Sequence, residues 1–425
     1  MLPADASNLP LLILLLATGI TWAVQTAAET LNIRHQPQIP PAEFRDVLDQ
    51  QSYQRSLDYA TSHARLGLVR STTLTAVIFL LLLSGGFGSL NSWLHGFGLP
   101  PLVTGLSFFA LLALGNALLD LPFQVFETFV LEERFDFNRT TASTFVTDKL
   151  KALFLACLLG LPLLAALLAF LQQAGFWMWL PAWAVVALFT LVLRFVAPWL
   201  ILPLFNRYQP LPEGELKTAI TEYAKEQGFD LSGVYVMDGS RRSTKSNAFF
   251  TGFGKKKRIA LFDTLIDRHT TGEILGVLAH EIGHFKKGHI HLQTALGLLQ
   301  TALFLALLFA VTSSPAILDA FGPDQQGSHL GLLFFLLAFS PLSLLLSIPA
   351  NALSRVFERQ ADAHVVRSTG SAQALVSALK KLVKDNKSLL APHPLYVALN
   401  ASHPPIVERL HHLRRVEGEH ARESG

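Results

Sequence analysis

Seven long apolar stretches dominate the chain, and each is long enough to cross a lipid bilayer as a helix. A membrane-spanning helix needs about 20 mostly apolar residues. Stretches of that length lie near residues 8–28, 72–92, 102–124, 150–172, 176–204, 292–313 and 329–351. The pattern predicts an all-α polytopic membrane protein with seven transmembrane helices. The segment before the first stretch has an acidic residue and no basic one, which predicts a retained helix rather than a cleaved signal peptide.

Two polar stretches are long enough to fold outside the lipid. They divide the chain into four segments, of which the first and third carry the apolar stretches. The predicted segments are residues 1–204 with helices one to five, 205–291, 292–351 with helices six and seven, and 352–425. Neither polar segment is expected to form a complete domain alone.

The first polar segment mixes helical and strand patterns. An amphipathic 3.6-residue period predicts a helix at about 212–228. Two short β-type runs, GVYVMDGS at 233–240 and RIALFDTLI at 258–266, are separated by a basic turn at 252–258. A helical pattern returns over 271–291. We therefore expect a small α+β domain here.

Composition agrees with the membrane class. Half of the residues (51%) are hydrophobic and only 15% are charged, which is too apolar for an ordinary soluble protein. The single cysteine, Cys157, excludes an intramolecular disulfide and a cysteine-ligated metal site. The net charge of +3 is spread over several segments, so we expect no nucleic-acid partner.

The distribution of basic residues predicts the orientation. Lysines and arginines number 5 in residues 31–70, 4 in 131–151, 13 in 205–291 and 11 from 352 onward. Because cytoplasmic loops carry the excess of Lys and Arg, these four stretches are predicted to be cytosolic. The N-terminus then lies outside, and both polar segments face the cytosol.

The stretch VLAHEIGHFKKGHI, residues 277–290, carries candidate chemistry. On a helix, His280 and His284 lie one turn apart on one face and can direct their imidazoles at one point. Glu281 lies on the adjoining face. This is the H-E-x-x-H arrangement in which two histidines bind zinc and a glutamate acts as general base. His289 is expected to project to the opposite face, and His291 lies roughly 16 Å further along the axis.

A catalytic zinc needs three protein ligands, so a third must come from elsewhere. In SRVFERQADAH, residues 354–364, Glu358 and Asp362 lie four apart on one helical face just after the seventh span. Topology places them on the same membrane surface as His280 and His284. By spacing alone, either carboxylate can bind zinc while the other orients a ligand imidazole. The alternative is a surface salt-bridge face with Arg355 and Arg359.

From these residues onward the chain resembles a known family, the type I CAAX prenyl proteases, which are integral membrane zinc endopeptidases of the gluzincin type. The resemblance covers most of the chain. Besides HEIGH and ERQAD, it rests on FVLEERFDFNRTT at 129–141, PLFNRYQPLPEGELK at 203–217, SNAFFTGFGKKKRIALFDTLI at 246–266 and SHPPIVERL at 402–410.

The resemblance implies roles that spacing left open. It makes Glu358 the third zinc ligand and Asp362 the partner of a ligand histidine. It implies that Asn247 contacts the peptide backbone or the tetrahedral intermediate, and that His403 and Arg409 approach the substrate carbonyl. Without the resemblance, a turn cap at Asn247 and a structural role for His403 and Arg409 would be the simpler interpretations.

The resemblance also implies the architecture and the setting. Seven helices would enclose a water-filled intramembrane chamber, with one zinc ion per chain near its cytosolic cap. The chain would be a multi-pass protein of a bacterial inner membrane, or of the endoplasmic reticulum membrane if eukaryotic. One position departs from the family pattern: His364 stands where an aromatic residue is common, which affects local packing rather than the ligands.

The predicted reaction is peptide hydrolysis by a zinc-activated water, with Glu281 taking the proton. The substrate would be a protein ending in a prenylated C-a-a-X box or a misfolded or membrane-associated peptide. Two other functions would need features that the sequence can test. A seven-helix metal or proton transporter would place ionisable residues inside the spans, yet almost all lie outside them. A catalytically silent zinc scaffold would lack Glu281, which is present.

Overall fold

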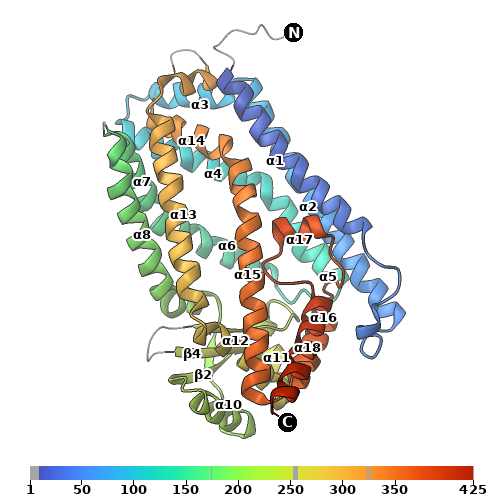
Figure 1. Ribbon diagram of the computed structural model, residues 1–425. Helices are drawn as coiled ribbons and strands as arrows, with labels where there is room; N and C mark the ends of the chain where they lie inside the picture. Colours follow the sequence, from blue (N-terminus) through green and yellow to red (C-terminus); the bar gives the residue numbers. More distant parts are fainter. Residues whose placement is uncertain (1–8, 174, 252–256, 323–324, 326, 425) are drawn as a thin grey trace.

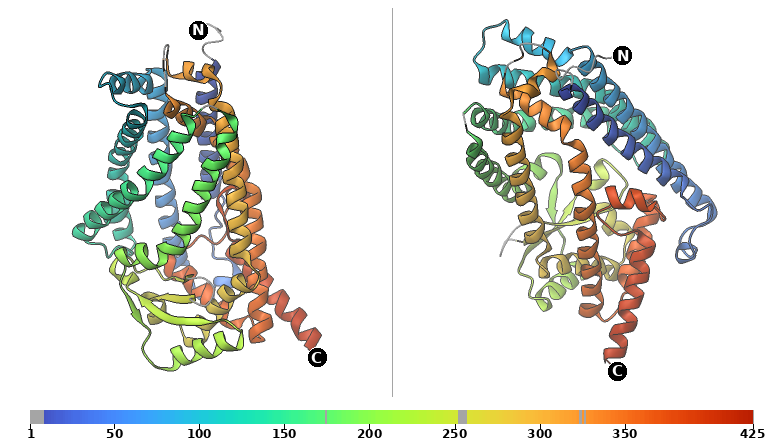
Figure 2. Two further views of the ribbon diagram at one scale, coloured as in Figure 1. Left: turned by 90° about the vertical axis from the view of Figure 1, so that its left-hand side faces the viewer. Right: turned by 45° about the horizontal axis from the view of Figure 1, so that its top comes forward.

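The computed structural model describes residues 9–173, 175–251, 257–322, 325 and 327–424 (Figure 1). Long helices form the larger part of the molecule, and a small sheet with shorter helices lies at the end that holds the C-terminus. Two further views show the same division (Figure 2).

Among the described residues, six helical stretches are long and apolar enough to cross a membrane, and a bent pair makes a seventh. In each of the six, only 6% to 17% of the most apolar 18-residue window is buried inside the protein, as expected of helices whose apolar surface faces lipid. The predicted architecture is thus confirmed. The stretches are Leu9–Arg34, Gln50–Leu83, Pro101–Arg134, Ala142–Leu171, Phe176–Phe205, His289–Thr312, and Ser328–Ala338 with Ser340–Thr369, bent by 50°.

Three of these stretches contain a π-helical turn between α-helical parts, a local widening that interrupts the i to i+4 pattern without ending the helix. The parts are α4 (Pro101–Phe126), η3 (Glu127–Leu131) and α5 (Glu132–Arg134); α6 (Ala142–Leu155), η4 (Ala156–Gly160) and α7 (Leu161–Leu171); and α8 (Trp179–Val196), η6 (Ala197–Ile201) and α9 (Leu202–Phe205). The remaining long helices are α1 (Leu9–Arg34), α2 (Gln50–Leu83), α13 (His289–Thr312), α14 (Ser328–Ala338) and α15 (Ser340–Thr369).

The second span differs from the prediction. Helix α2 ends at Leu83, and the apolar residues that follow form a separate short helix, α3 (Gly86–His95). The chain turns at Gly85, whose φ of 67° lies in the left-handed region that glycine adopts without strain. The predicted span at 72–92 was therefore wrong in its second half, because an apolar run alone does not reveal a glycine turn within it.

A four-stranded sheet follows the fifth span. Its order is β1-β2-β4-β3, so β1 and β3 are the edges. The strands β2 and β4 pair in parallel, whereas β1 and β3 pair antiparallel to their neighbours. The two predicted strands are confirmed in part: β2 ends at Met237, and β4 ends at Phe262. The last four residues of the second predicted strand, 263–266, instead begin helix α11 (Asp263–Arg268). Most of the predicted basic turn at 252–258 lies outside the described residues. The strands are β1 (Tyr208–Pro210), β2 (Leu231–Met237), β3 (Ala248–Thr251) and β4 (Lys257–Phe262).

Three helices accompany the sheet. The predicted helix at 212–228 is confirmed as α10 (Glu215–Glu226), and α11 (Asp263–Arg268) follows β4. Helix α12 (Thr271–Lys286) begins at a capping box formed by Thr270 and Glu273. It ends earlier than predicted, because Gly288 adopts a φ of 67° and α13 then starts at His289. The expected continuous helix over 271–291 was wrong for this reason.

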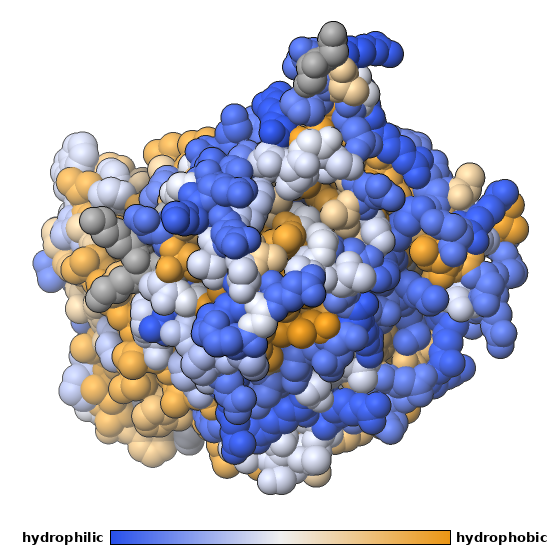
Figure 3. Space-filling view, turned by 90° about the horizontal axis from the view of Figure 1, so that it is seen from below, coloured by the Kyte–Doolittle hydropathy of each residue, from blue (hydrophilic) through white to orange (hydrophobic). Residues whose placement is uncertain are grey.

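The end of the chain adds three helices, α16 (Gln373–Asn386), α17 (Pro394–Asn400) and α18 (Ile406–Ser424). Helices α16 and α18 share one buried apolar core with α12, α15 and the sheet, to which α12 contributes Ile274, Leu278, Ala279 and Ile282. Helix α12 is therefore the centre of this region. The outer surface of this whole region is mostly hydrophilic when seen from below, as Figure 3 shows. Such a surface suits a cap that lies outside the lipid.

One close approach decides how α12 meets α15. A Cβ atom added at Gly283 would lie 3.1 Å from the Cα atom of Ala361. The glycine of HEIGH therefore lets the two helix backbones come together at this point. Because Ala361 stands between Glu358 and Asp362 on α15, this contact brings both carboxylates to the histidines of α12.

Candidate metal centre

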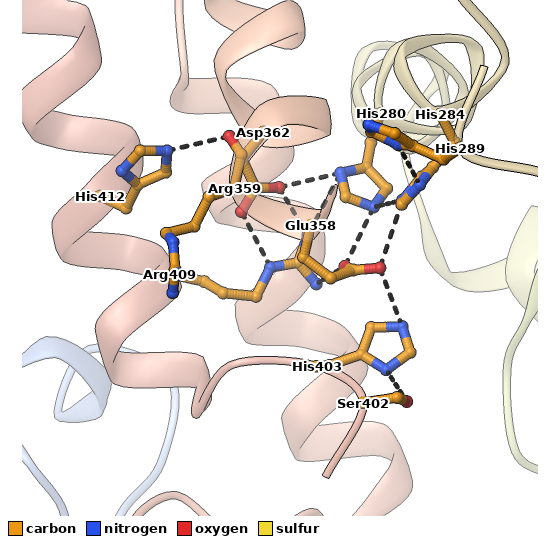
Figure 4. Close-up of polar contacts among 10 residues, drawn as sticks. All are labelled: His280, His284, His289, Glu358, Arg359, Asp362, Ser402, His403, Arg409 and His412. Atoms are coloured by element: carbon orange, nitrogen blue, oxygen red, sulfur yellow. Dashed lines mark hydrogen bonds and ion pairs between the residues drawn. The ribbon is translucent and has the colours of Figure 1, made fainter. Parts of the chain in front are cut away.

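Helices α12 and α15 direct three potential metal ligands at one point (Figure 4). The Nε2 atoms of His280 and His284 lie 3.2 Å apart. Glu358 closes the triangle, with Oε2 3.4 Å from His280 Nε2 and Oε1 3.2 Å from His284 Nε2. His280 and Glu358 are buried. The three residues predicted from two distant segments therefore meet in the folded chain.

This triangle fits a zinc ion. Zinc binds imidazole nitrogen and carboxylate oxygen at about 2.0 Å in a tetrahedron, whose ligand atoms are then about 3.3 Å apart. The two histidine nitrogens are 3.2 Å apart, close to that edge. Each also has one of the two Glu358 oxygens at 3.2 to 3.4 Å, and one ligand atom from each residue lies within 4.8 Å of the others. In addition, Oε2 of Glu358 is buried without a hydrogen-bond partner, which leaves a carboxylate oxygen in need of a cation.

The electrostatics also favour a positive charge at this point. Burial and the nearby Arg409 guanidinium lower the pKa of His280, but the adjacent carboxylates of Asp362 and Glu358 outweigh them and raise it to about 9. The carboxylates thus stabilise positive charge on the inner imidazole. A divalent cation would satisfy the same demand while leaving the imidazole neutral.

The second ring nitrogen of His280, Nδ1, points away from the proposed metal position and is held by an ion pair of Asp362 and Arg409. This nitrogen lies 2.9 Å from Oδ1 of Asp362, a carboxylate with no exposed surface. Arg409 of α18 donates to both oxygens of Asp362, from Nη2 at 2.6 Å and from Nε at 3.0 Å. A carboxylate beside a ligand histidine fixes its tautomer and ring orientation. Sequence spacing placed Asp362 nearby, but only the fold brings in Arg409.

The alternative of a surface salt-bridge face on α15 is excluded. Glu358 and Asp362 are buried. Arg355 does not pair with them; it donates to the backbone carbonyls of Val397 and Ala401 at 3.0 and 2.7 Å. This arginine therefore ties α15 to α17 instead.

The second ring nitrogen of His284, Nδ1, contacts the uncharged ring of His289, a partner that the sequence did not reveal. This nitrogen lies 3.0 Å from Nδ1 of His289, and His289 Nε2 lies 2.8 Å from the side-chain oxygen of Gln360. The ring of His289 is buried and stacks on Phe357 at 4.3 Å. The expectation that His289 points away was wrong, because the turn at Gly288 folds it back toward His284.

These contacts set the tautomers. The Gln360 oxygen can only accept, so His289 carries its proton on Nε2 and offers Nδ1 as an acceptor. His284 then donates from Nδ1, which leaves its Nε2 lone pair free for a metal. We call Gln360, His289 and His284 the neutral relay.

Glu281 lies on the neighbouring face of α12. It lines a small apolar cavity beside Ala248 of β3 and Ile259 of β4. Burial raises the pKa of its carboxyl above the usual range, although His280 and His284 oppose that shift. A raised pKa suits a group that must accept a proton near neutral pH and later release it.

Two of the residues implied by the resemblance lie in unlike places. His403 reaches the cluster from the loop before α18: its Nε2 lies 3.3 Å from Oε1 of Glu358, and its side chain is 63% exposed. Asn247 precedes β3 and is exposed, and its side-chain oxygen accepts from the backbone nitrogen of Ala248 at 2.8 Å. Among the described contacts, none joins Asn247 to the metal ligands.

Two family models cover nearly the whole chain. Residues 29–207 match the model described as CAAX prenyl protease N-terminal, five membrane helices. Residues 210–417 match the model described as Peptidase family M48. The boundary between them falls where the fifth span ends and the sheet begins.

Known relatives match over most of their length. A CAAX prenyl protease 1 homolog of Arabidopsis thaliana is 37% identical over 89% of this chain and 90% of its own. The Homo sapiens homolog is 32% identical over 98% and 97%, respectively. The crystal structure of S. mikatae Ste24p superposes with a TM-score of 0.88 at 29% identity, covering 95% of this chain and 99% of that one.

Proposed function

Because the chain belongs to peptidase family M48 and is a multi-pass membrane metalloendopeptidase of the CAAX prenyl protease type, we propose that His280, His284 and Glu358 hold its metal and that this metal is zinc. The carrying observation is that the two histidine nitrogens lie 3.2 Å apart and that each lies 3.2 to 3.4 Å from a carboxylate oxygen of Glu358. Because the chain belongs to this family, we propose an endopeptidase rather than the metal or proton transporter or the catalytically silent zinc scaffold.

Glu281 is the general base in this proposal. When bound, zinc makes a water molecule acidic near neutral pH and polarises a carbonyl group. Glu281, beside the ligands on α12 and with a raised pKa, removes the proton of the attacking water. It then returns that proton to the departing amine, since the same carboxyl can act as base and acid in turn.

His403 and Arg409 divide the remaining work. His403 is exposed and its Nε2 faces the cluster, so it can donate to the oxygen on which charge develops. Arg409 is buried and engages both oxygens of Asp362. We assign it to positioning Asp362 and to balancing the charge of the carboxylates rather than to direct contact with the substrate.

A substrate peptide has a place to lie beside the ligands. Strand β3 is an edge of the sheet and begins next to Glu281. An extended peptide can pair with such an edge through main-chain hydrogen bonds. Asn247, immediately before β3, would then contact the peptide backbone, as the resemblance implies.

The substrate class follows from the relatives, whose names describe CAAX prenyl proteases. We propose C-terminally prenylated proteins or membrane-associated and misfolded peptides as substrates, delivered from the bilayer to a cap on the cytosolic side. In this proposal, the spans of segments 1–204 and 292–351 form a membrane cage around an intramembrane chamber. The polar segments 205–291 and 352–425 together form the cap over it. A cavity of about 550 Å³ between α1, α13, α14 and α15 supports a route inside the cage.

The test compares Glu281→Gln with the wild type in purified full-length protein. We expect the variant to retain zinc and its thermal stability but to lose cleavage of a farnesylated C-a-a-X peptide. Glu419→Gln, an exposed position on α18, is the matched control and should keep full activity. Ordinary turnover by Glu281→Gln would show that the assigned base is wrong.

The unprenylated twin of that peptide, with and without a zinc chelator, tests the substrate class. Chelator-sensitive cleavage of both peptides indicates a broad membrane peptidase, whereas cleavage of the lipidated one alone indicates protein maturation. Cleavage that persists after removal of all metal would contradict the proposed site.

A further inference from the structure

A second cavity lies where the fifth span meets the sheet, away from the cluster of metal ligands. It has a volume of about 360 Å³. One wall comes from the last turns of the span and the start of β1, including Trp199, Arg207 and Tyr208; the other comes from the sheet, including Tyr235 and Arg258. The proposed reaction uses none of these residues.

The sheet presents this wall because its two faces differ. In β4, Ile259 and Leu261 point into the apolar core under α12. Alternation along a strand then places Arg258 and Ala260 on the opposite face, where Tyr235 of β2 is paired with Ala260. The guanidinium carbon of Arg258 stands 3.6 Å from the centre of the Trp199 ring and 4.9 Å from that of Tyr235. Arg258 thus links the sheet to the end of the span.

Two hydrogen-bond donors in this cavity lack an acceptor. The Nε atom of Arg258 and the hydroxyl of Tyr208 are both buried and have no hydrogen-bond partner among the described residues. Among the described residues, the lining includes two arginines and no acidic residue. The nearby carboxylate of Asp238 accepts instead from the backbone nitrogen of Arg207 at 2.7 Å. Buried donors of this kind call for a ligand rich in acceptors and negative charge.

The cavity lies at the level of lipid headgroups. On the same turns as Trp199, the side chains of Leu200 and Leu204 are 65% and 45% exposed, which identifies the lipid-facing side of the span. Tryptophan at the end of a span is typical of the membrane interface. The ammonium group of Lys151 donates to the carbonyl of Leu204 at 2.7 Å and adds positive charge at this level.

We propose that this cavity binds the phosphate group of an anionic phospholipid. Arg258 and Tyr208 would donate to the phosphate oxygens, Arg207 would add charge at the rim, and Trp199 would hold the Arg258 guanidinium in place. A lipid bound there would fasten the cap to the end of the fifth span.

The test measures lipid retention on the full-length protein by native mass spectrometry, after exchange into detergent with phosphatidylglycerol or phosphatidylcholine. We expect the wild type to retain phosphatidylglycerol preferentially and Arg258→Gln to bind it about tenfold more weakly, which equals about 1.4 kcal/mol. Tyr208→Phe should weaken binding less. Arg139→Gln changes the net charge equally at an exposed site elsewhere and should bind as the wild type does.

Competition with inorganic phosphate distinguishes the source of the ligand. Displacement by millimolar phosphate, dependent on Arg258, supports an anion site that a soluble phosphate can also fill; no displacement supports recognition of the whole lipid. If Arg258→Gln is unstable, Tyr208→Phe and Arg258→Lys carry the test. Equal retention of both lipids by the wild type and the variants, with no phosphate binding, would overturn the proposal.

Discussion

In the proposed zinc site, the two histidines of HEIGH are held in place by different kinds of neighbour. His280 rests against the buried carboxylate of Asp362, which Arg409 holds with two hydrogen bonds. His284 belongs to the neutral relay, in which its Nδ1 contacts His289 and His289 contacts Gln360. Within one helical turn, a ligand with an ionic support stands beside one with an uncharged support.

The difference follows from where each ring lies. His280 is turned toward the interior of the cap, where the pairing of Asp362 with Arg409 offsets the cost of burying a carboxylate. His284 is nearer the start of α13, where the turn at Gly288 brings in another imidazole. A carboxylate raises the basicity of the imidazole it supports, whereas a neutral acceptor mainly fixes its tautomer and direction. The ionic side should therefore matter more for metal affinity.

The first prediction concerns the ionic support of His280. Asp362→Asn keeps the size of the side chain but removes the charge that supports His280 and leaves Arg409 buried without its partner. We expect zinc affinity, measured by competition with a chelator, to fall by roughly 10- to 100-fold, with activity falling in parallel at limiting zinc. Asp267→Asn on the exposed side of α11 is the matched control. Unchanged zinc affinity in Asp362→Asn would show that the ionic support is dispensable.

The second prediction concerns the uncharged support of His284. His289→Phe keeps a ring that can stack on Phe357 but removes the acceptor for His284. We expect zinc affinity to fall by about tenfold or less, toward the lower end of effects seen for residues that support a ligand. His291→Phe, two residues further on and exposed, should leave affinity unchanged. The comparison would be reversed if His289→Phe lost more affinity than Asp362→Asn.

Gln360 offers a separate check that His289 acts through its tautomer. Gln360→Leu leaves His289 in place but frees its Nε2, so both tautomers become accessible. We expect a loss of zinc affinity smaller than that of His289→Phe, and partial recovery in Gln360→Asn if the shorter amide still reaches the ring. A purely structural role for Gln360 would lower thermal stability without changing zinc affinity.

These supports also show how far the sequence alone could lead. The four-residue spacing of His280 and His284 follows from helix geometry, and the order of spans indicates that Glu358 and Asp362 emerge beside them. The neutral relay could not be anticipated, because a continuous helix through residue 291 would have carried His289 away. Only the left-handed backbone at Gly288 reverses that direction, and glycine permits such a conformation without requiring it.

The membrane region shows the same limit. Hydrophobic length identifies spans because lipid imposes a minimum number of apolar residues, yet it placed the second span across the turn at Gly85. Arg409 illustrates the opposite case. Its distance in sequence from Asp362 conveys nothing about contact, and the pair forms only because α18 packs into the core that α12 and α15 share.

The smallest expected effect lies at the far end of α12, where Glu273 tests whether the two supports act locally. Burial raises the pKa of Glu273, but hydrogen bonds from Lys381, Ser377 and the backbone of Thr270 outweigh it and lower the pKa from 4.5 to about 2. A lowered pKa in the folded state means that the ionised carboxylate stabilises the fold above about pH 4.5. That stabilisation is lost as the pH falls from 4.5 toward 2.

Glu273→Gln should therefore reduce the free energy of unfolding by about 1–2 kcal/mol at pH 7, once screening of the partly exposed Lys381 is allowed for. The difference from the wild type should persist down to about pH 5 and shrink below pH 4.5, measured by thermal unfolding in detergent. Glu273 fastens α12 to α16 and touches neither histidine. The zinc affinity of the fully folded variant should therefore be unchanged. If Glu273→Gln instead altered the relative effects of Asp362→Asn and His289→Phe, the supports would depend on the placement of the whole helix rather than on their own contacts.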